Sequence, residues 1–251
     1  MAMTRPLILL ALFSLSGLGC VSASRQQQSV ASTDLGTAYL REGNPAAALG
    51  ALQQAVKRDP RNWEAWDRLG LAYWAQQDFV ESEKAFLRGE KVAPGKAEIL
   101  NNHALMLMAQ GENARAVELL QQARGDLVYR RMSMVLSNLG RALQLEGRQE
   151  EALEVLDQAL VRTPNFCPAQ FHRALVLEDL DRLDGALASY ELVIRACGDE
   201  AIGAYFHAGQ LLAKRGDRQA ACTYFSTAQD RSRPGGDLFE AARKARAIEC
   251  P

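Results

Sequence analysis

Four cysteines in the last third of the chain have the spacing that most clearly suggests chemistry. Four cysteines allow three disulfide connectivities, and an even number is typical of an exported, cross-linked chain. Free buried thiols in a reducing compartment are the alternative. The sequence has no C-x-x-C motif, which argues against a thiol oxidoreductase. The four are Cys167, Cys197, Cys222 and Cys250, and a fifth, Cys20, stands near the start.

The other reactive side chains do not form a catalytic pattern. His103, His172 and His207 stand singly, without a second ligand three or four residues away, which argues against a zinc site. The sequence has no nucleophile elbow, phosphate-binding loop or dinucleotide fingerprint. The pairs Glu150-Glu151 and Glu178-Asp179 are interpreted as solvated helix faces. We therefore predict that the protein is not an enzyme and needs no metal or cofactor.

Composition narrows both the fold and the partners. The 251 residues include 29 Lys and Arg against 30 Asp and Glu, so no basic excess exists to neutralise nucleic-acid phosphates. Hydrophobic residues make up 48% of the chain and aromatic residues only 7%. The abundance of Ala, Leu, Gln, Glu and Arg favours helix throughout. We predict an all-α protein that does not bind nucleic acid.

The first residues have the order of an export signal: a basic residue, an apolar run and small residues. Arg5 precedes the apolar run 7–15, which is too short to span a bilayer. Cys20 follows Leu18-Gly19, and this resembles the lipobox of bacterial lipoproteins, although Gly17 stands where leucine is usual. We expect a lipoprotein signal peptide at 1–19 and a lipidated Cys20 with a short tether at 20–28. A plain cleaved signal is the alternative.

A repeat with a period of 34 residues decides the predicted fold. A leucine–glycine pair, or a small-residue equivalent, recurs 34 residues apart three times, with two extra residues from 103 to 139 and one from 173 to 208. This is the period of the tetratricopeptide repeat, a hairpin of helices A and B. The pairs are Leu35-Gly36, Leu69-Gly70, His103-Ala104, Leu139-Gly140, Arg173-Ala174 and Ala208-Gly209.

We predict six such repeats over residues 29–236, stacked as a right-handed superhelix. The small residues let helices A and B approach closely, and Pro60, Pro94 and Pro164 end helix B. Residues 237–251 are predicted to form a capping helix, because the last repeat would otherwise expose its apolar face. The predicted repeats are 29–62, 63–96, 97–130, 133–166, 167–200 and 202–235.

Repeat geometry selects one disulfide connectivity. Cys167 opens helix A of repeat five and Cys197 follows helix B of the same repeat, so the antiparallel hairpin brings them together. Cys222 lies in helix B of repeat six, and Cys250 ends the capping helix beside it. We predict the pairs Cys167–Cys197 and Cys222–Cys250.

The second, fifth, ninth and twelfth residues of each repeat are expected to line a groove. In repeats one to three they predict an apolar stripe suited to an amphipathic helix or an extended apolar segment of a partner. The alternative is that Leu71 and Leu105 pack inside and only Trp74 is exposed. Arg141 is the single predicted groove cation, which disfavours a clamp for a C-terminal carboxylate. The predicted partner-binding residues are Leu40, Leu71, Trp74, Asn101, Leu105 and Met108.

Taken together, these features resemble the type IV pilus pilotins, the PilF, PilW and Tgl group. More particular elements are Asn101-Asn102 at the start of repeat three and the lengthened junction at 126–131. His103-Ala104 departs from the aromatic–glycine pair usual in the family. The four cysteines are similar to those of the myxobacterial Tgl branch. The resemblance implies an outer-membrane lipoprotein on the periplasmic face that helps secretin subunits insert and assemble into a ring.

Two other functions remain open on the sequence. One is a generic periplasmic or outer-membrane repeat scaffold that organises cell-wall enzymes or other envelope complexes. The second is a repeat module associated with a separate catalytic partner. In each case we expect a monomer that acts by binding proteins.

Overall fold

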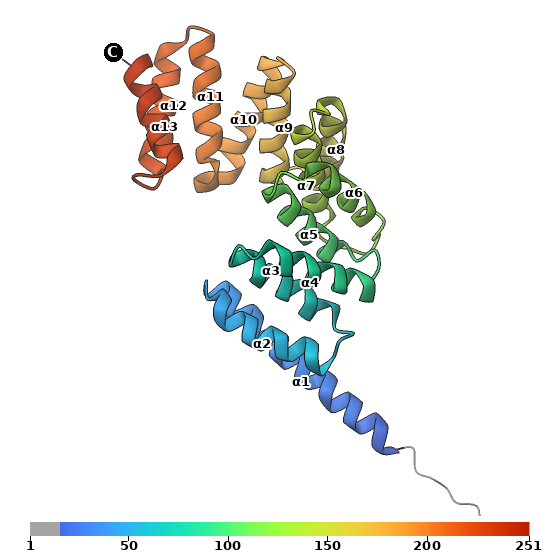
Figure 1. The fold of residues 1–251 in the computed structure, drawn as a ribbon. Helices are drawn as coiled ribbons and strands as arrows, with labels where there is room; N and C mark the ends of the chain where they lie inside the picture. Colours follow the sequence, from blue (N-terminus) through green and yellow to red (C-terminus); the bar gives the residue numbers. More distant parts are fainter. Residues whose placement is uncertain (1–15, 251) are drawn as a thin grey trace, which may run out of the picture. The chain divides into compact units, whose positions relative to one another are not determined.

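The computed structural model describes residues 16–250, which form thirteen α-helices, one short 3₁₀ helix and no β-strand (Figure 1). The predicted all-α fold is confirmed. The helices are α1 (Ser16–Arg41), α2 (Pro45–Arg58), α3 (Trp63–Ala75), α4 (Phe79–Val92), α5 (Ala97–Ala109), α6 (Asn113–Ala123), α7 (Met132–Leu145), α8 (Gln149–Arg162), α9 (Cys167–Asp179), α10 (Leu183–Cys197), η1 (Gly198–Ala201), α11 (Ile202–Lys214), α12 (Arg218–Arg231) and α13 (Asp237–Glu249).

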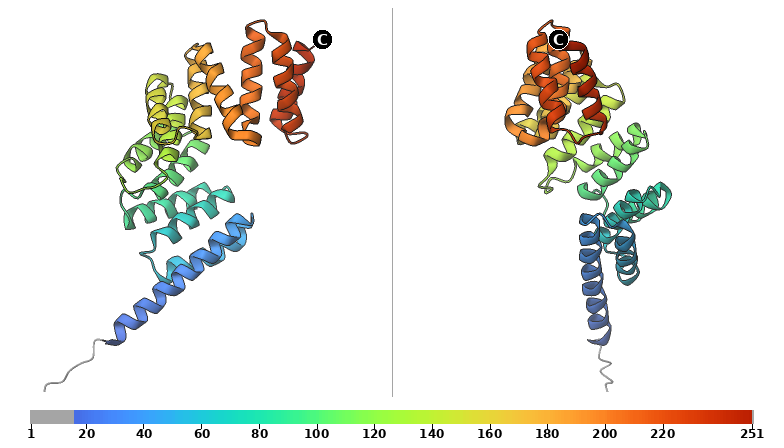
Figure 2. Two further views of the ribbon diagram at one scale, coloured as in Figure 1. Left: turned by 180° about the vertical axis from the view of Figure 1, so that it is seen from behind. Right: turned by 90° about the vertical axis from the view of Figure 1, so that its left-hand side faces the viewer.

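Consecutive helices pair into six hairpins, from α1–α2 to α11–α12 (Figures 1 and 2). The last helix, α13, packs against α12 and occupies the place predicted for the capping helix. The chain divides between Pro94 and Gly95 into two compact units. Among the described residues, the first unit holds α1 to α4 and the second holds α5 to α13.

Glycine in helix A explains why the two helices of a hairpin approach so closely. A Cβ atom on Gly36 would lie 2.4 Å from Leu52 Cγ, and one on Gly140 would lie 2.4 Å from Leu156 Cγ. Both leucines are fully buried. Because a real Cβ cannot approach so near, glycine is required in these hairpins unless the neighbour moves. The repeated small residue in the sequence therefore marks the contact between helices A and B.

The turn between helices A and B recurs with the same period. In four hairpins the second of its three residues is glycine with a positive φ, and Gln77 and Asp181 take the same backbone conformation in the other two. The residues and φ angles are Gly43 (71°), Gln77 (62°), Gly111 (80°), Gly147 (74°), Asp181 (55°) and Gly216 (81°). Glycine carries no steric penalty in this region, whereas Gln and Asp do. The backbone thus repeats even where the sequence departs from the pattern.

The segment predicted to be a tether, residues 20–28, is helical, because α1 begins at Ser16 and continues to Arg41. No proline or glycine follows Gly19 in this segment, so nothing interrupts the helix that repeat one needs. Residues 1–15 of the predicted signal peptide and the side chain of Cys20 lie outside the described residues. Within the described range, every helix is too short or too polar to cross a bilayer.

Candidate partner-binding site

The predicted partner-binding residues lie on one face of each helix A. The fifth, ninth and twelfth residues of a repeat are spaced i, i+4 and i+7, so they share a helical face, which we call the A-face. On α1 the A-face is Thr33, Thr37 and Leu40; on α3 it is Asp67, Leu71 and Trp74; on α5 it is Asn101, Leu105 and Met108.

In the first unit the apolar A-face residues are partly accessible. Leu40 packs against the core of the first hairpins and remains half-buried. Leu71 and Trp74 are also half-buried. The alternative in which Trp74 alone is exposed therefore does not describe this unit. Trp74 and Leu71 together can offer apolar surface to a partner, because each has area left to bury.

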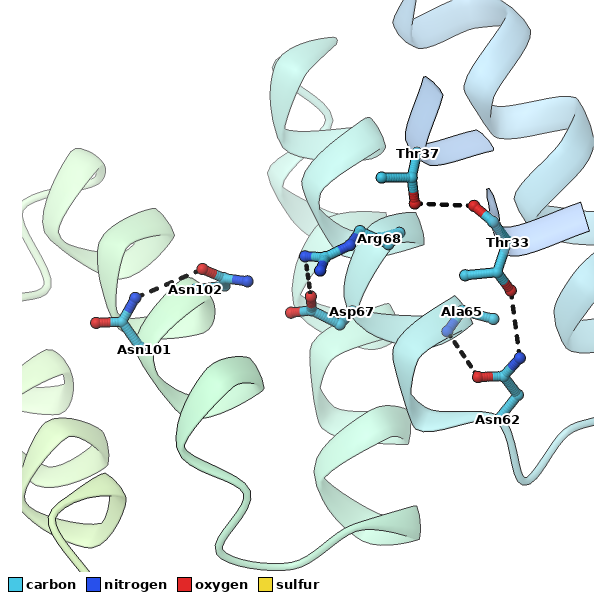
Figure 3. Close-up of polar contacts among 8 residues, drawn as sticks. All are labelled: Thr33, Thr37, Asn62, Ala65, Asp67, Arg68, Asn101 and Asn102. Atoms are coloured by element: carbon cyan, nitrogen blue, oxygen red, sulfur yellow. Dashed lines mark hydrogen bonds and ion pairs between the residues drawn. The ribbon is translucent and has the colours of Figure 1, made fainter. Parts of the chain in front are cut away.

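The A-face residue at the fifth position of the repeat is polar and buried in the first unit. Asn62 caps α3, with its Oδ1 accepting from Ala65 N at 3.1 Å, and its Nδ2 donates to Thr33 Oγ1 at 3.2 Å (Figure 3). Asp67 is fully buried and accepts from Arg68 Nη1 at 2.7 Å. These contacts satisfy the polar groups within the fold, so the predicted apolar stripe does not extend over this position.

In the second unit, two of the predicted residues are not available to a partner, which corrects the sequence prediction. Asn101 is 1% exposed, and its Oδ1 accepts from Asn138 Nδ2 at 2.7 Å while its Nδ2 lies 3.5 Å from Asn102 Oδ1. Met108 is 8% exposed. Asn101 is therefore part of an internal amide network, and Met108 is part of the interior. Leu105 alone remains half-buried.

One disulfide lies within repeat five, and a second joins repeat six to the last helix. Cys167 is bonded to Cys197 across the α9–α10 hairpin, with their Cα atoms 6.0 Å apart. Cys222 on α12 is bonded to Cys250 at the end of α13, with their Cα atoms 5.5 Å apart. These are the pairs that hairpin geometry selects. Each closes a loop of about 30 residues in the unfolded chain and is expected to add about 2–4 kcal/mol of stability.

A cavity of about 280 Å³ beside the first disulfide was not predicted from the sequence. Phe171, on the A-face of α9, lines this cavity. The centroid of its ring lies 5.9 Å from the ring centroid of Tyr190. Gly203 leaves room for the ring, since a Cβ there would lie 3.1 Å from Phe171 Cζ. Pro168, Phe171 and Gly203 occupy predicted groove positions of repeats five and six, so the repeat pattern already pointed to this part of the surface. The lining residues are Cys167, Pro168, Phe171, His172, Val193, Glu200 and Gly203.

Glu178 corrects the interpretation of the Glu178-Asp179 pair as a solvated face. Its Oε2 accepts from Tyr190 Oη at 2.9 Å and lies 3.6 Å from His207 Nδ1. His207 stacks on Tyr190 with ring centroids 5.5 Å apart. His207 and Tyr190 hold the pKa of Glu178 below its usual value, and burial raises the pKa of Tyr190. Tyr190 is fully buried, so its hydroxyl needs this acceptor.

His172 is a half-buried side chain that stays neutral near neutral pH. Burial, with a smaller contribution from the charge of Arg141, lowers the pKa of His172 to about 4. It contributes to the cavity wall as an uncharged ring. Within the described range, no three His, Cys, Asp or Glu side chains gather closely enough to hold a metal ion.

A family model described as tetratricopeptide repeat matches residues 33–97 and 101–165, which is more than half of the chain. The chain belongs to the tetratricopeptide-repeat family. The two matched segments cover repeats one to four. The tetratricopeptide-repeat fold thus agrees with the six hairpins and with their recurring turns.

The sequence relatives are proteins of different kinds. The chain is 25% identical over 136 residues to the type IV pilus assembly protein PilF of Pseudomonas aeruginosa, covering 54% of each chain. It is 29% identical over 158 residues to a probable UDP-N-acetylglucosamine–peptide N-acetylglucosaminyltransferase, SPINDLY, of Hordeum vulgare, covering 61% of this chain. The match spans only 17% of that transferase, so the chain resembles a part of it.

Solved structures match over most of the chain. The structure of P. aeruginosa PilF superposes with a TM-score of 0.74 at 22% identity, covering 88% of this chain and 99% of that one. PilW, described as a widely conserved type IV pilus biogenesis factor, superposes with a TM-score of 0.74 at 21% identity, covering 86% and 98%. At this level of identity, the similarity shows a shared fold.

Proposed function

We propose that this chain is a non-enzymatic pilotin: an outer-membrane lipoprotein, anchored through Cys20 on the periplasmic face, that assists insertion and multimer assembly of the type IV pilus secretin. The observation that carries the proposal is the match to PilF, whose solved structure is covered to 99% by this chain. The correspondence also extends over 88% of this chain. The Leu-Gly-Cys sequence at 18–20 and the cysteine pattern of the Tgl branch add support.

The partner is a secretin segment that buries apolar surface on the A-face. Leu71 and Trp74 on α3 retain accessible apolar area, and so does Leu40 on α1 of the same unit. A lipid anchor keeps the bound segment close to the membrane, which raises its effective concentration there. The protein acts as a monomer, and binding rather than bond chemistry performs the work.

A repeat scaffold for other envelope complexes is the second candidate function. The sequence similarity to a part of SPINDLY extends over 158 residues, against 136 for PilF. Repeats of this kind serve many partners because the fold does not specify the client. Recovery of cell-wall synthases with the chain, instead of a secretin, would select this function.

Replacement of Cys20 by alanine tests the anchor. The variant should move from the outer-membrane fraction to the soluble periplasmic fraction, and secretin multimers should fall sharply, because the chain no longer stays at the membrane. Wild-type fractionation of Cys20→Ala would contradict lipidation. Normal multimers with a soluble variant would show that anchoring is not needed.

Replacement of Trp74 by glutamate tests the A-face. The change puts a charge on a surface that must become buried against the partner, so secretin multimers should be lost while the chain stays folded. Val80→Glu, at an exposed position on α4 of the same unit, is the matched control. Thermal unfolding of both variants shows whether folding is retained. Equal multimer levels in the two variants would argue against this surface.

A further inference from the structure

The connection between α6 and α7 exposes two apolar side chains on a projecting turn. It lies at the junction that carries two residues more than the 34-residue period. Leu127 is 91% exposed and Val128 is 83% exposed, more than the other large apolar side chains of the second unit except Val161 at 84%. Burial of apolar side chains is favourable, so exposed ones that stand together usually mark a surface that contacts something else.

Hydrogen bonds hold this turn in one conformation. Asp126 Oδ2 accepts from the backbone N–H of Ala97 at 3.2 Å, which fixes the start of the turn to the start of α5. The N–H of Gly125 donates to Gln122 O at 3.0 Å, and that of Tyr129 donates to Asp126 O at 3.1 Å. The two apolar side chains therefore point outward from an ordered backbone. Because the backbone is already ordered, a partner that covers these side chains does not have to order the loop.

Three arginines flank the apolar tip without an acidic partner. Arg124 donates to Gln158 Oε1 at 3.1 Å, and Arg131 lies 3.2 Å from Met134 Sδ. Among the described side chains, no carboxylate lies within ion-pair distance of these two arginines or of Arg130. The one acidic residue of the turn, Asp126, already accepts from the α5 backbone. The turn thus combines uncovered apolar atoms with uncompensated positive charge.

We propose that residues 124–131 form a membrane-contact loop that inserts Leu127 and Val128 into the interface of an anionic bilayer while the flanking arginines bind lipid phosphates. A bilayer deforms around a projecting apolar tip, whereas a protein partner must supply a matching pocket. Long arginine side chains keep their charge at headgroup level while the neighbouring apolar groups lie deeper. Each arginine near an anionic surface strengthens binding about fivefold. The proposal does not depend on lipidation of Cys20.

A spin label on the loop tests insertion directly. The full chain with Cys20→Ser and Val128→Cys is labelled with a nitroxide and mixed with vesicles of phosphatidylcholine and phosphatidylglycerol in equal parts. Collisions of the label with oxygen should rise, and collisions with a water-soluble nickel complex should fall, as the label enters the interface. The same label at Val80→Cys, another exposed valine, should stay in water. Because residues 7–15 are unchanged in both proteins, their own membrane affinity affects both equally.

A charge variant tests the headgroup contact. The double change Arg130→Gln and Arg131→Gln should weaken binding to these vesicles more than tenfold and leave binding to pure phosphatidylcholine little changed, since about fivefold is expected per arginine. The control is Arg88→Gln with Lys91→Gln, at exposed positions on α4. A label at position 128 that stays in water on anionic vesicles would overturn the proposal. So would shielding of the label that occurs only when a secretin is added, or equal binding by the two double variants.

Discussion

Repeats one to four and repeats five and six differ at the fifth residue of the repeat. In the first four repeats this residue is a small polar side chain that is buried: Thr33, Asp67, Asn101 or Ser137. In the last two it is Phe171 or Phe206, each only half-buried. Thr33, Asp67 and Asn101 make hydrogen bonds within the fold, whereas Phe171 lines a cavity and both phenylalanine rings make aromatic contacts.

Repeat five differs from its neighbours in what holds its hairpin together. Close contacts between glycine and a large side chain join helices A and B in repeats one, two, four and six. Repeat five has Ala174 in place of glycine and Tyr190 in place of leucine, and it carries a disulfide and a buried tyrosine–glutamate hydrogen bond. The comparison teaches that covalent and charge-assisted contacts can stabilise a hairpin whose helices match the repeat pattern less well.

Removal of the disulfides should have the largest effect and should be confined to one region. Cys222→Ala with Cys250→Ala should lower the free energy of unfolding of the last repeats by about 2–5 kcal/mol, because the unfolded chain regains its loop entropy. Hydrogen exchange followed by mass spectrometry should show faster exchange in α11 to α13 and unchanged exchange in α1 to α4. A uniform increase along the chain, or none, would contradict the regional difference.

A side chain at the glycine contact should destabilise the other region. Gly140→Val should cost about 1–3 kcal/mol, because the added carbons overlap Leu156, whose Cγ lies only 2.4 Å from the position of a Cβ. Gly50→Ala is the control, since a Cβ there meets nothing within 4 Å. Urea unfolding measures both. If Gly140→Val is as stable as Gly50→Ala, close packing does not hold this hairpin.

Loss of the Tyr190 hydroxyl should have a smaller, pH-dependent effect. Tyr190→Phe removes a hydrogen bond to a carboxylate and should cost about 1–2 kcal/mol at neutral pH. Since the folded state lowers the pKa of Glu178, its contribution is complete above the unfolded-state pKa of about 4.3 and is lost as the pH falls through the folded-state pKa. The variant should therefore lose less stability than wild type in that acid range. An unchanged pH profile would contradict this assignment.

An exposed ion pair should matter least. Arg182 Nη2 lies 2.7 Å from Glu150 Oε1 between repeats four and five, and both side chains are half or more exposed. Glu150→Gln should change the unfolding free energy by less than about 1 kcal/mol, because water screens the pair. A larger loss in thermal unfolding would mean that surface charge contributes to joining the two regions.

The sequence predicted the parts of the fold that repeat. The positions of glycine, alanine and the large helix-B residues recur with the period, so helix pairing and both disulfide pairs could be inferred from register. The departures could not. Nothing in the letters around Asn101 shows that its amide pairs with Asn138 on α7, and Tyr190 gives no sign that its hydroxyl reaches Glu178. These contacts join residues of different helices, and they depend on small shifts that spacing alone does not encode.

The partner surface was predicted less well for a related reason. Periodicity places a residue on the A-face but does not say how far neighbouring side chains cover it. Trp74 and Leu71 remain half-buried, whereas Met108, at the same register position as Trp74 one repeat later, is interior. The Phe171 cavity lay at groove positions too, but its size depends on Gly203, which belongs to the next repeat.

We propose that this chain promotes assembly of a secretin in the outer membrane, and the amount of secretin multimer in cells measures this role directly. Cells that lack the chain should contain secretin monomers and few detergent-resistant multimers, and expression of the wild-type chain should restore the multimers. Normal multimer levels without the chain would contradict the account.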